Sequence, residues 1–565
     1  DAKAFVRGSI ASVDDALAGA RDIIAEDLAV DARRRSLVRD LTRRHGLVTT
    51  AVKRGADASG KYEAYVDVQE RASHIPSHRY LAICRAEAEG ILSVKLRPDV
   101  DRTAEEVLRT VRIRRGSPWA AELQAAVEDA TKRLLVPVAE RAVRAELKTL
   151  ADDEAIDVFQ RNLEAVLLSA PFGARPVIGV DPGIRTGCKC AVVDATGALV
   201  AHETLYLVGR SRPQDTELLR LLRRHSPAAV AVGNGTGGRE AEAVVREVVR
   251  DAGLDCLVVS VNESGASIYS ASDVAREELP DVDLTVRGAV SIARRLQDPL
   301  AELVKVDAKS LGVGQYQHDV DQGKLGRRLD DVVESCVNRV GVALNTASPM
   351  LLAHVAGIGP KLARSVVDHR TAAGPFPTRQ ALLKVPGLGK KTFEQCAGFL
   401  RIRGGREPLD GTAVHPERYA LVARIARDQG TTPAGLIGGQ HRLDLKKYVG
   451  GDVGEATLRD IVTELHKPGL DPREQFEAPT FRDDVREIGD LEVGMTLEGV
   501  VTNVTNFGAF VDIGVHCDGL VHVSQLADHY VRDVHAEVKP GDRVSVRVVE
   551  VDLRRKRIAL SRKGV

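Results

Sequence analysis

The sequence predicts a multidomain protein: a mainly α-helical scaffold with an inserted α/β domain, a pair of helical hairpins and a C-terminal all-β barrel. Three observations predict this class. The chain has 565 residues, which is the length of roughly four domains. The spacing of the apolar residues changes from helical to strand-like near residue 176, and strand-like spacing appears again near residue 492. Between these two points, one short glycine-rich unit occurs twice.

The composition is that of a globular protein, with 44% hydrophobic and 28% charged residues. No run of eighteen apolar residues is present, which excludes a membrane-spanning helix, and no signal peptide opens the sequence. The seven cysteines are scattered without a CxxC pair, which argues against a disulfide framework and against a zinc site. We therefore expect a cytoplasmic protein without metal or cofactor. Because the first residue is Asp1, we expect the natural N-terminus to lie upstream.

Charge is distributed unevenly, although the whole chain is neutral with 80 basic and 80 acidic residues. Residues 349–408 contain ten basic and three acidic residues, a net charge of +7. Residues 177–348 have a net charge of −4. A basic block beside a mildly acidic one predicts that only part of the chain meets nucleic acid.

Residues 1–175 are predicted to form the helical scaffold. Apolar residues recur at helical spacing in residues 16–26, and a region with few helix breakers runs from Ser117 to about Ser169. Fifty residues of helix would be about 75 Å long. Pro137 lies inside this region and is expected to kink or split the helix, because proline lacks the amide hydrogen. A long central helix of this kind serves as a spine rather than as a catalytic device.

Residues 176–348 are predicted to form an α/β domain with a mixed sheet. Apolar segments with strand character alternate with helical segments in the order β-β-β-α-β-α-β. The first strand, residues 177–181, runs into a glycine-rich turn that begins at Asp181. Cys188 and Cys190 are two residues apart on the second strand and therefore share one face, which favours packing in the core.

The repeated unit in residues 349–408 is the most specific local signal. In each copy, two glycines flank one apolar residue, which favours a tight turn between short helices where main-chain amides can approach a phosphate. Basic residues follow each turn. The residues assigned to this binding site are Gly357, Gly359, Lys361, Gly387, Gly389, Lys390 and Lys391. The unit resembles the tandem helix-hairpin-helix of DNA repair and competence proteins, which implies backbone binding without sequence readout. The alternative is a hairpin that serves only for packing.

Residues 490–565 alternate at period two with glycine turns, as expected of an all-β barrel, and residues 409–480 are expected to form a small helical domain and linker. The barrel resembles the OB-fold RNA-binding repeat first known from the largest small-subunit ribosomal protein. The matching segments are residues 494–501, 506–511, 518–524 and 557–561. The resemblance assigns nucleic-acid binding to Phe507, Phe510, His522, Asp552 and Arg557. Two rings on an open sheet give bases a stacking surface, and Gly508 permits the bend that brings both to one face. The alternative is that both rings belong to the core.

Asp181 begins the pattern Asp-x-Gly-x-x-x-Gly at a strand end, where a ribonuclease-H-like nuclease carries its first metal-binding carboxylate. Such a site needs two or more further carboxylates to hold paired Mg²⁺ ions about 4 Å apart. At the second expected position stands Asn234, which is neutral, and the candidates for a third acid are Glu263, Asp273 and Asp319. The domain resembles the YqgF branch of RuvC-like resolvases, and we interpret Asp181 and Asn234 as a vestigial nuclease site without catalytic residues. Actin-like ATPases share this turn, but they need a second copy of it, and this sequence has no second copy.

The order of the four parts resembles the bacterial transcription accessory protein family Tex, over essentially all 565 residues. The family's N-terminal helix-turn-helix segment is absent from this sequence. The resemblance implies a non-enzymatic scaffold for transcription or RNA handling that binds single-stranded RNA, with DNA as a further ligand. It implies RNA polymerase or ribosome-associated machinery as partners, no membrane, and a monomer. The alternative is a metal-dependent nuclease or resolvase that uses the α/β domain.

Overall fold

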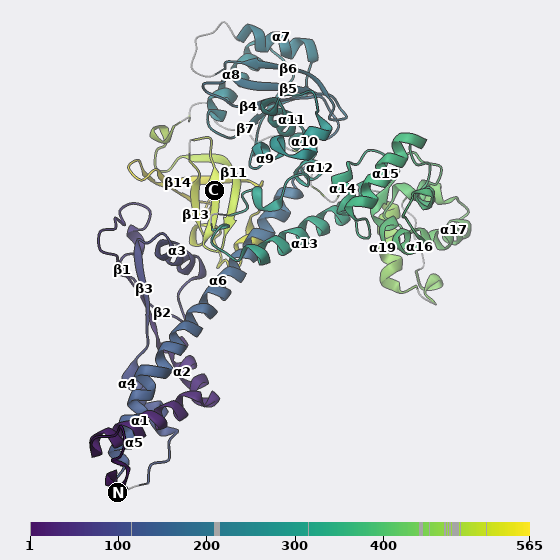
Figure 1. Cartoon of the computed structure of the whole chain (residues 1–565). Helices are drawn as coiled ribbons and strands as arrows, with labels where there is room; N and C mark the ends of the chain where they lie inside the picture. The colour runs from purple at the N-terminus through teal and green to yellow at the C-terminus, as the bar shows by residue number, and fades with distance from the viewer. Residues whose placement is uncertain are drawn as a thin grey trace. The chain divides into compact units, whose positions relative to one another are not determined.

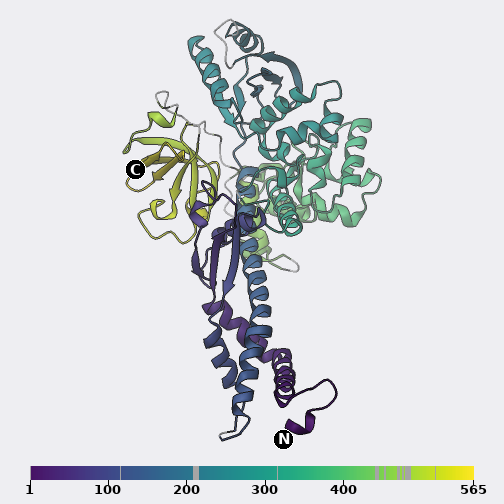
Figure 2. The same cartoon turned by 60° about the vertical axis from the view of Figure 1, so that its left-hand side comes forward.

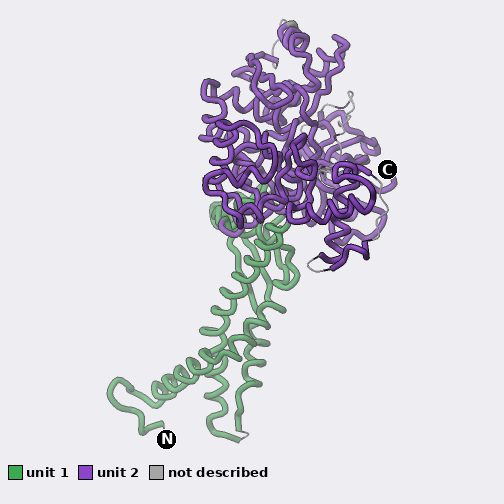
Figure 3. Tube along the Cα trace, turned by 90° about the vertical axis from the view of Figure 1, so that its right-hand side faces the viewer, with its two compact units in different colours: residues 1–157, 315–322 green, residues 158–314, 323–565 purple. Residues whose placement is uncertain are grey.

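The structure is a computed structural model of the chain (Figure 1; Figure 2 gives a second view). The residues that it describes are 2–114, 116–207, 215–314, 316–439, 445–450, 453–467, 471, 473, 476, 485, 487–515 and 517–565. Two compact units make up the chain (Figure 3): residues 1–157 with 315–322 form the first, and residues 158–314 with 323–565 form the second. Within the described residues, no helix is both long enough and apolar enough to cross a membrane.

The first unit combines helices with a three-stranded antiparallel sheet of order β2-β1-β3. Its helices are α1 (Val13–Val30), α2 (Ala32–His45), α3 (Ser77–Ala88), α4 (Val100–Arg109), α5 (Ala120–Asp129) and the start of α6 (Val136–Leu167). Its strands are β1 (Leu47–Val52), β2 (Gln69–Arg71) and β3 (Leu92–Arg97). The helical interpretation of residues 1–175 misses this sheet, although residues 92–97 alternate strictly between apolar and polar side chains.

The long helical region is irregular where the sequence predicts a kink or a split. A π-helical turn (Ala130–Leu135) separates α5 from α6, and Pro137 is the second residue of α6. Asp129, Ala130 and Val136 keep right-handed helical dihedrals, so the chain stays helical from α5 through this turn into α6. The wider turn directly precedes Pro137, whose missing amide hydrogen interrupts the regular hydrogen bonds of an α-helix. The predicted spine is therefore present, with a local irregularity before Pro137 and with 32 residues in α6.

The α/β domain has a five-stranded mixed sheet of order β6-β5-β4-β7-β8, and the predicted order of elements is confirmed. The strands are β4 (Val177–Asp181), β5 (Cys188–Val193), β6 (Leu199–Leu205), β7 (Ala229–Gly233) and β8 (Leu257–Val261). β4 pairs antiparallel with β5 and parallel with β7, which pairs parallel with β8. This topology, in which the first strand is central and the second is antiparallel to it, is that of the ribonuclease-H-like fold.

Helices cover both faces of this sheet, so the strands are buried on both sides. α7 (Asp215–His225) and α8 (Gly238–Asp251) pack on one face, in a core that includes Cys188 and Cys190 as predicted. α11 (Leu284–Gln297) packs on the other face. The shorter helices that follow the sheet are α9 (Ala266–Ala271), α10 (Asp273–Glu278) and α12 (Pro299–Leu303).

Helical elements continue from α13 to α19. They are α13 (Gln322–Val340), α14 (Pro349–Ala353), α15 (Pro360–Ala373), α16 (Lys390–Cys396), α17 (Tyr419–Asp428), α18 (Pro433–Leu436) and α19 (Glu455–His466), with the short strands β9 (Val342–Ala343) and β10 (Leu400–Arg401). Arg379 is fully buried and donates to the carbonyl oxygens of Leu400 and Val414, both at 2.8 Å, which ties the hairpin region to α17–α19. Residues 468–470 and 472 of the expected linker lie outside the described residues.

The C-terminal domain is a closed five-stranded barrel of order β11-β12-β13-β15-β14, as the period-two pattern predicts. The strands are β11 (Thr496–Thr505), β12 (Gly508–Asp512), β13 (Gly519–His522), β14 (Arg543–Asp552) and β15 (Arg557–Ser561), with α20 (Val534–Glu537) between β13 and β14. Its core is built from inward aliphatic side chains, Val501, Val511, Val521, Val546 and Leu560 among them. Because these inward residues fill the barrel, the alternating positions face outward.

Candidate nucleic-acid interface

Two turns in residues 349–408 share one main-chain geometry. Gly357 and Gly387 have φ values of 83° and 88°, a left-handed conformation that favours glycine. Two residues later, Gly359 and Gly389 are the N-caps of α15 and α16. At both caps, the space that a side chain would occupy is free of other atoms within 4 Å. A ligand can therefore approach the main chain at the start of each helix.

The cations predicted for this site lie beside the open main chain. Ile358 and Leu388, between the paired glycines, are only 2% and 5% exposed and anchor the two turns in the core. Lys361, Lys390 and Lys391 are exposed at the helix starts, and none of them forms an ion pair with a described residue. The turns are thus packed on their inner side and cationic on their outer side.

In the barrel, the rings of Phe507 and Phe510 lie together. Their centroids are 6.2 Å apart and their planes meet at 87°, an edge-to-face contact. Both side chains are half-buried, and neither belongs to the buried core. Gly508 between them cannot carry a side chain, because a Cβ there would collide with the carbonyl oxygen of Val521. Phe507 precedes β12, so the chain bends before the strand and brings both rings to one face.

The strand register extends this face toward His522 and Arg557. Gly508 pairs with the exposed His522, and Phe510 pairs with Leu520, which pairs in turn with Ala559 of β15. Arg557 is two residues before Ala559, so it points to the same side of the sheet and is exposed. The predicted rings, the imidazole and the guanidinium therefore share the outer face of β12, β13 and β15.

The side chain of Asp552 stabilises the turn between β14 and β15. Its carboxylate accepts the amide hydrogens of Arg554 and Arg555, both at 3.0 Å, and these bonds lower the pKa of the carboxyl group. Asp552 also pairs across the strands with Arg557. Its carboxylate thus shapes the turn that presents Arg557.

At the α/β domain, the strand ends bring two carboxylates together. Asp181 ends β4 and packs against Gly288 of α11, where a larger residue would collide with its carboxylate. Burial raises the pKa of Asp181 to about 6, and the negative charge of Glu263, which follows β8, adds to the rise. Asn234 follows β7 and its side-chain oxygen accepts the amide hydrogen of Glu263 at 3.2 Å. Sequence reasoning names Glu263 as a candidate but cannot place it beside Asp181.

A buried cation accompanies this pair of carboxylates. Arg295 of α11 is 4% exposed and donates to the carbonyl oxygens of Asn262 and Ser264 at 2.8 and 2.7 Å. Burial raises the pKa of Glu263, and the charge of Arg295 opposes that rise. The sequence pattern assigns Arg295 no role at the strand ends, because only the packing of α11 brings it to the end of β8.

The other two candidate acids have different partners. Asp273 begins α10 and forms an exposed ion pair with Arg276 at 2.9 Å. Asp319 belongs to the first unit and forms an ion pair with Arg85. Among the described residues, no three His, Cys, Asp or Glu side chains gather where they could hold a metal ion.

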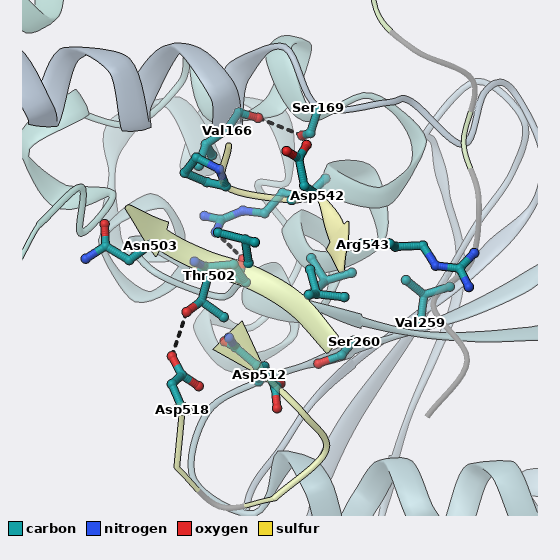
Figure 4. A pocket seen from close by; sticks show the side chains of 18 of the residues that line it. Val166, Ser169, Val259, Ser260, Thr502, Asn503, Asp512, Asp518, Asp542 and Arg543 are labelled. Atoms are coloured by element: carbon teal, nitrogen blue, oxygen red, sulfur yellow. Dashed lines mark hydrogen bonds between the residues drawn. The ribbon is translucent and has the colours of Figure 1, made fainter. Parts of the chain in front are cut away.

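A cleft of 2370 Å³ lies in the second unit, lined by the end of α6, the α/β domain and the barrel (Figure 4). Thr502 donates its hydroxyl hydrogen to Asp518 at 2.6 Å in its wall. Among the described residues that line it, acidic and basic side chains occur in similar numbers, so these residues lack the excess of positive charge expected of a nucleic-acid channel. Asn234 lines this cleft, but Phe507, Phe510 and His522 do not.

Family models match the chain in five consecutive segments. They are described as Tex central region-like (residues 1–159), Tex protein YqgF-like domain (175–297), helix-hairpin-helix motif (337–401), HHH domain (407–473) and S1 RNA binding domain (490–563).

Curated relatives match over almost the whole chain. The transcriptional accessory protein Tex of Neisseria gonorrhoeae is 47% identical, over 99% of this chain and 75% of the relative. Protein YhgF of Escherichia coli is 48% identical, over 98% of this chain and 73% of the relative. Among solved structures, Thermus thermophilus RuvC is similar over 21% of this chain and 90% of that chain, with 22% identity and a TM-score of 0.16.

Proposed function

Because this chain belongs to the Tex family of transcription accessory proteins, we propose that it is a non-catalytic scaffold that holds single-stranded RNA beside RNA polymerase or ribosome-associated machinery. Its S1 and helix-hairpin-helix domains are nucleic-acid-binding domains. In the proposal, the barrel binds the single strand and the hairpins bind backbone, with DNA as a further ligand. The protein acts in the cytoplasm as a monomer.

One observation carries this proposal: the joined rings of Phe507 and Phe510 on the outer face of the barrel. Half-buried rings are held rigidly by their inner edges while an outer surface stays open for a base. Base–aromatic stacking contributes about 1–3 kcal/mol per base and tolerates every sequence. His522 and Arg557 on the same face add hydrogen-bond donors and positive charge for the phosphates.

The hairpins add binding that is independent of base identity. Lys361 and Lys390 face outward at two helix starts, and no base-reading element accompanies them in the turns. Contacts to phosphates fix the position of a nucleic acid but carry no sequence information. We therefore assign positioning of the strand to the hairpins and stacking to the barrel.

The nuclease is the second candidate function, and the meeting of Asp181 with Glu263 is the observation that favours it. The fold family implies paired Mg²⁺ ions, but the side chains here do not fit them. Asn234 contributes no charge where a carboxylate is needed, and the buried guanidinium of Arg295 lies beside Glu263. A fixed cation repels a second cation, and two carboxylates are too few for two divalent ions. We therefore derive no metal-dependent step from this domain.

Crosslinking in living cells tests the proposed function. RNA is labelled with a photoreactive uridine, and the crosslinked peptides and co-purified proteins of the full chain are identified by mass spectrometry. We expect RNA crosslinks in the peptide around Phe507 and Phe510, and subunits of RNA polymerase or of the ribosome among the partners. RNA crosslinks confined to peptides outside the barrel, or an absence of RNA crosslinks, would contradict the proposal.

A further inference from the structure

Within the first unit, helices cover one face of the β2-β1-β3 sheet. Inward residues of β1 and β3 are buried, Val48 and Leu96 among them, and α3 packs beside β3 (Figure 1). From α6, Arg144 donates to the carbonyl oxygen of Val94 at 3.3 Å. The alternating residues of the three strands face the other way and are exposed or half-exposed.

On the strands themselves, the outward side chains of the open face carry positive charge and no negative charge; the exposed Asp67 lies two residues before β2 and the exposed Asp99 two residues after β3. Its cations are Arg71 on β2 and Lys95 and Arg97 on β3, and all three are exposed. Leu47 of β1 pairs with both Arg71 and Arg97, so the two guanidinium groups belong to one row across the sheet. The other outward side chains on these fully described strands are Leu47, Thr49, Ala51, Gln69 and Ser93. None of them is acidic.

Further cations flank both ends of the face. α2 ends in Arg43 and Arg44 directly before β1, and the Ser73 hydroxyl donates to the Arg44 carbonyl oxygen at 3.2 Å, two residues from Arg71. Lys53 and Arg54 follow β1 at its other end. There the main-chain amide of Lys53 donates to the carbonyl oxygen of Ile91 at 2.9 Å. Neither these four residues nor Arg71, Lys95 and Arg97 form an ion pair with any described residue, although many other surface arginines do.

From this geometry we propose that the open face of β2-β1-β3 binds the phosphate backbone of a nucleic-acid duplex. Arg71 and Arg97 lie in one row and Lys95 is two residues from Arg97, so these cations repel one another. A polyanion relieves that repulsion while it releases its own counterions. A six-residue strand is roughly 17–20 Å long. Over that length a duplex presents about ten phosphate charges, at one per 1.7 Å of axis.

The chemistry of the face favours a duplex over a single strand. Apart from the cations, its outward side chains are small, aliphatic or amide, and none is aromatic. A single strand is held chiefly by stacking of its bases on rings, which the barrel provides and this sheet lacks. A duplex keeps its bases stacked internally and offers only phosphates and groove edges, which suit arginine and lysine on a flat surface.

Charge removal on the full chain tests this surface. The variant combines Arg71→Gln, Lys95→Gln and Arg97→Gln. Its matched control combines Arg33→Gln, Arg112→Gln and Lys132→Gln, which removes the same charges from exposed, unpaired positions of the first unit away from the three strands. Equilibrium binding to a random-sequence duplex and to an oligouridine of equal length is measured between 50 and 200 mM salt. We expect the variant to lose at least tenfold in duplex affinity at the lowest salt, and its salt slope to flatten by about 2.7, at roughly 0.9 per contact.

The outcomes decide the proposal in both directions. The control should keep the wild-type slope, and the oligouridine affinity of the variant should change less than the duplex affinity. An unchanged duplex affinity would overturn the proposal and leave an acidic protein as the partner of this face. Equal losses in the control, or a larger loss with oligouridine, would overturn it as well.

A measurement on the unmodified chain removes any dependence on the folding of the variants. Lysine acetylation by a small reagent is followed by mass spectrometry with and without duplex. We expect duplex to protect Lys95 and Lys53 severalfold more than Lys132. Equal acetylation of Lys95 with and without duplex would contradict the proposal.

Discussion

The barrel and the α/β domain each carry the fold of a known functional class, but they differ in what their side chains bring together. On the barrel, Phe507 and Phe510 meet at 6.2 Å and share their face with His522. At the strand ends of the α/β domain, Asp181 and Glu263 are close enough for their charges to interact. Their other neighbours are not acids: Asn234 accepts the amide hydrogen of Glu263, and the charge of the buried Arg295 acts on the Glu263 carboxylate. A fold places strand ends and faces, and the side chains that stand there decide whether a site results.

The two sites also differ in how many groups their chemistry needs. Stacking needs one open ring for each base and is additive, so a pair of rings already binds. Two-metal hydrolysis needs several carboxylates at once, because divalent ions about 4 Å apart repel each other unless negative charge surrounds them. We therefore expect one neutral side chain and one fixed cation to be enough to prevent two-metal catalysis, whereas the loss of one ring should only weaken binding.

The largest effect is expected on the barrel. Phe507→Ala with Phe510→Ala removes both stacking surfaces and should weaken binding of single-stranded RNA at least tenfold, because each stacked base contributes about 1–3 kcal/mol. Equilibrium binding of a labelled single strand measures this. The matched control is Tyr530→Ala, which removes an aromatic ring that is 90% exposed elsewhere on the barrel. Unchanged affinity in a double variant whose circular dichroism is native would show that the RNA surface lies elsewhere.

The hairpins should show a smaller effect that is general to all nucleic acids. Lys361→Gln with Lys390→Gln removes two phosphate contacts, which should weaken DNA and RNA alike and flatten the salt slope by about two. Lys467→Gln with Lys539→Gln removes two exposed lysines outside the hairpins and should leave the slope unchanged. A loss confined to one base sequence would indicate base-edge readout and would contradict the assignment of Gly357, Gly359, Gly387 and Gly389 to backbone binding.

In the α/β domain, substitution of Asp181 should change the stability of the fold rather than the binding of nucleic acid. The pKa of Asp181 is raised from its ordinary value of 3.8 to about 6 in the folded protein. Ionisation of its carboxyl group therefore destabilises the fold increasingly between pH 3.8 and pH 6, and by a constant amount at higher pH. Asp181→Asn should therefore stabilise by about 1–3 kcal/mol at pH 7.5, since a shift of one pKa unit corresponds to about 1.4 kcal/mol. The gain should fall to about half at pH 5 and to about a fifth at pH 4, and it should vanish below about pH 3, where the carboxyl group is protonated in both the folded and the unfolded state.

Thermal unfolding of both proteins across this pH range measures the effect, with a Tm increase of about 2–4 °C per kcal/mol expected at pH 7.5. Asp194→Asn is the matched control, because the pKa of Asp194 is lowered by hydrogen bonds in its turn. That variant should lose stability at pH 7.5. A Tm for Asp181→Asn that is lower than that of the wild type at pH 7.5 would show that the carboxylate is paired with a cation.

Much of the fold is predictable from local pattern, because glycine spacing and period two are properties of short segments. The turns at Gly357 and Gly387 and the barrel strands are found in this way. The sheet of the first unit is harder to detect: β1 leaves Leu47 exposed, and β2 has only three residues. The strict alternation in β3 is the one clear signal, and a helical interpretation of the surrounding residues overrides it.

The cluster around Asp181 depends on tertiary structure and could not be assembled from the sequence. Glu263 follows β8, which is separated from β4 by β7, so the two acids meet only through the strand order. The glycine at position 235 makes room for the Glu263 carboxylate, because a Cβ there would overlap it. Arg295 reaches the same place from α11. Sequence spacing contains none of these three relations.

A nuclease assay on the full chain tests the central claim, that the α/β domain supports a scaffold rather than a catalyst. Single-stranded, duplex and branched substrates are incubated with Mg²⁺ or Mn²⁺, with wild-type protein and with Asp181→Ala. We predict no cleavage above background by either protein, together with undiminished RNA binding by the variant. Robust turnover by the wild type that disappears in Asp181→Ala would contradict the account and identify the protein as a metal-dependent nuclease.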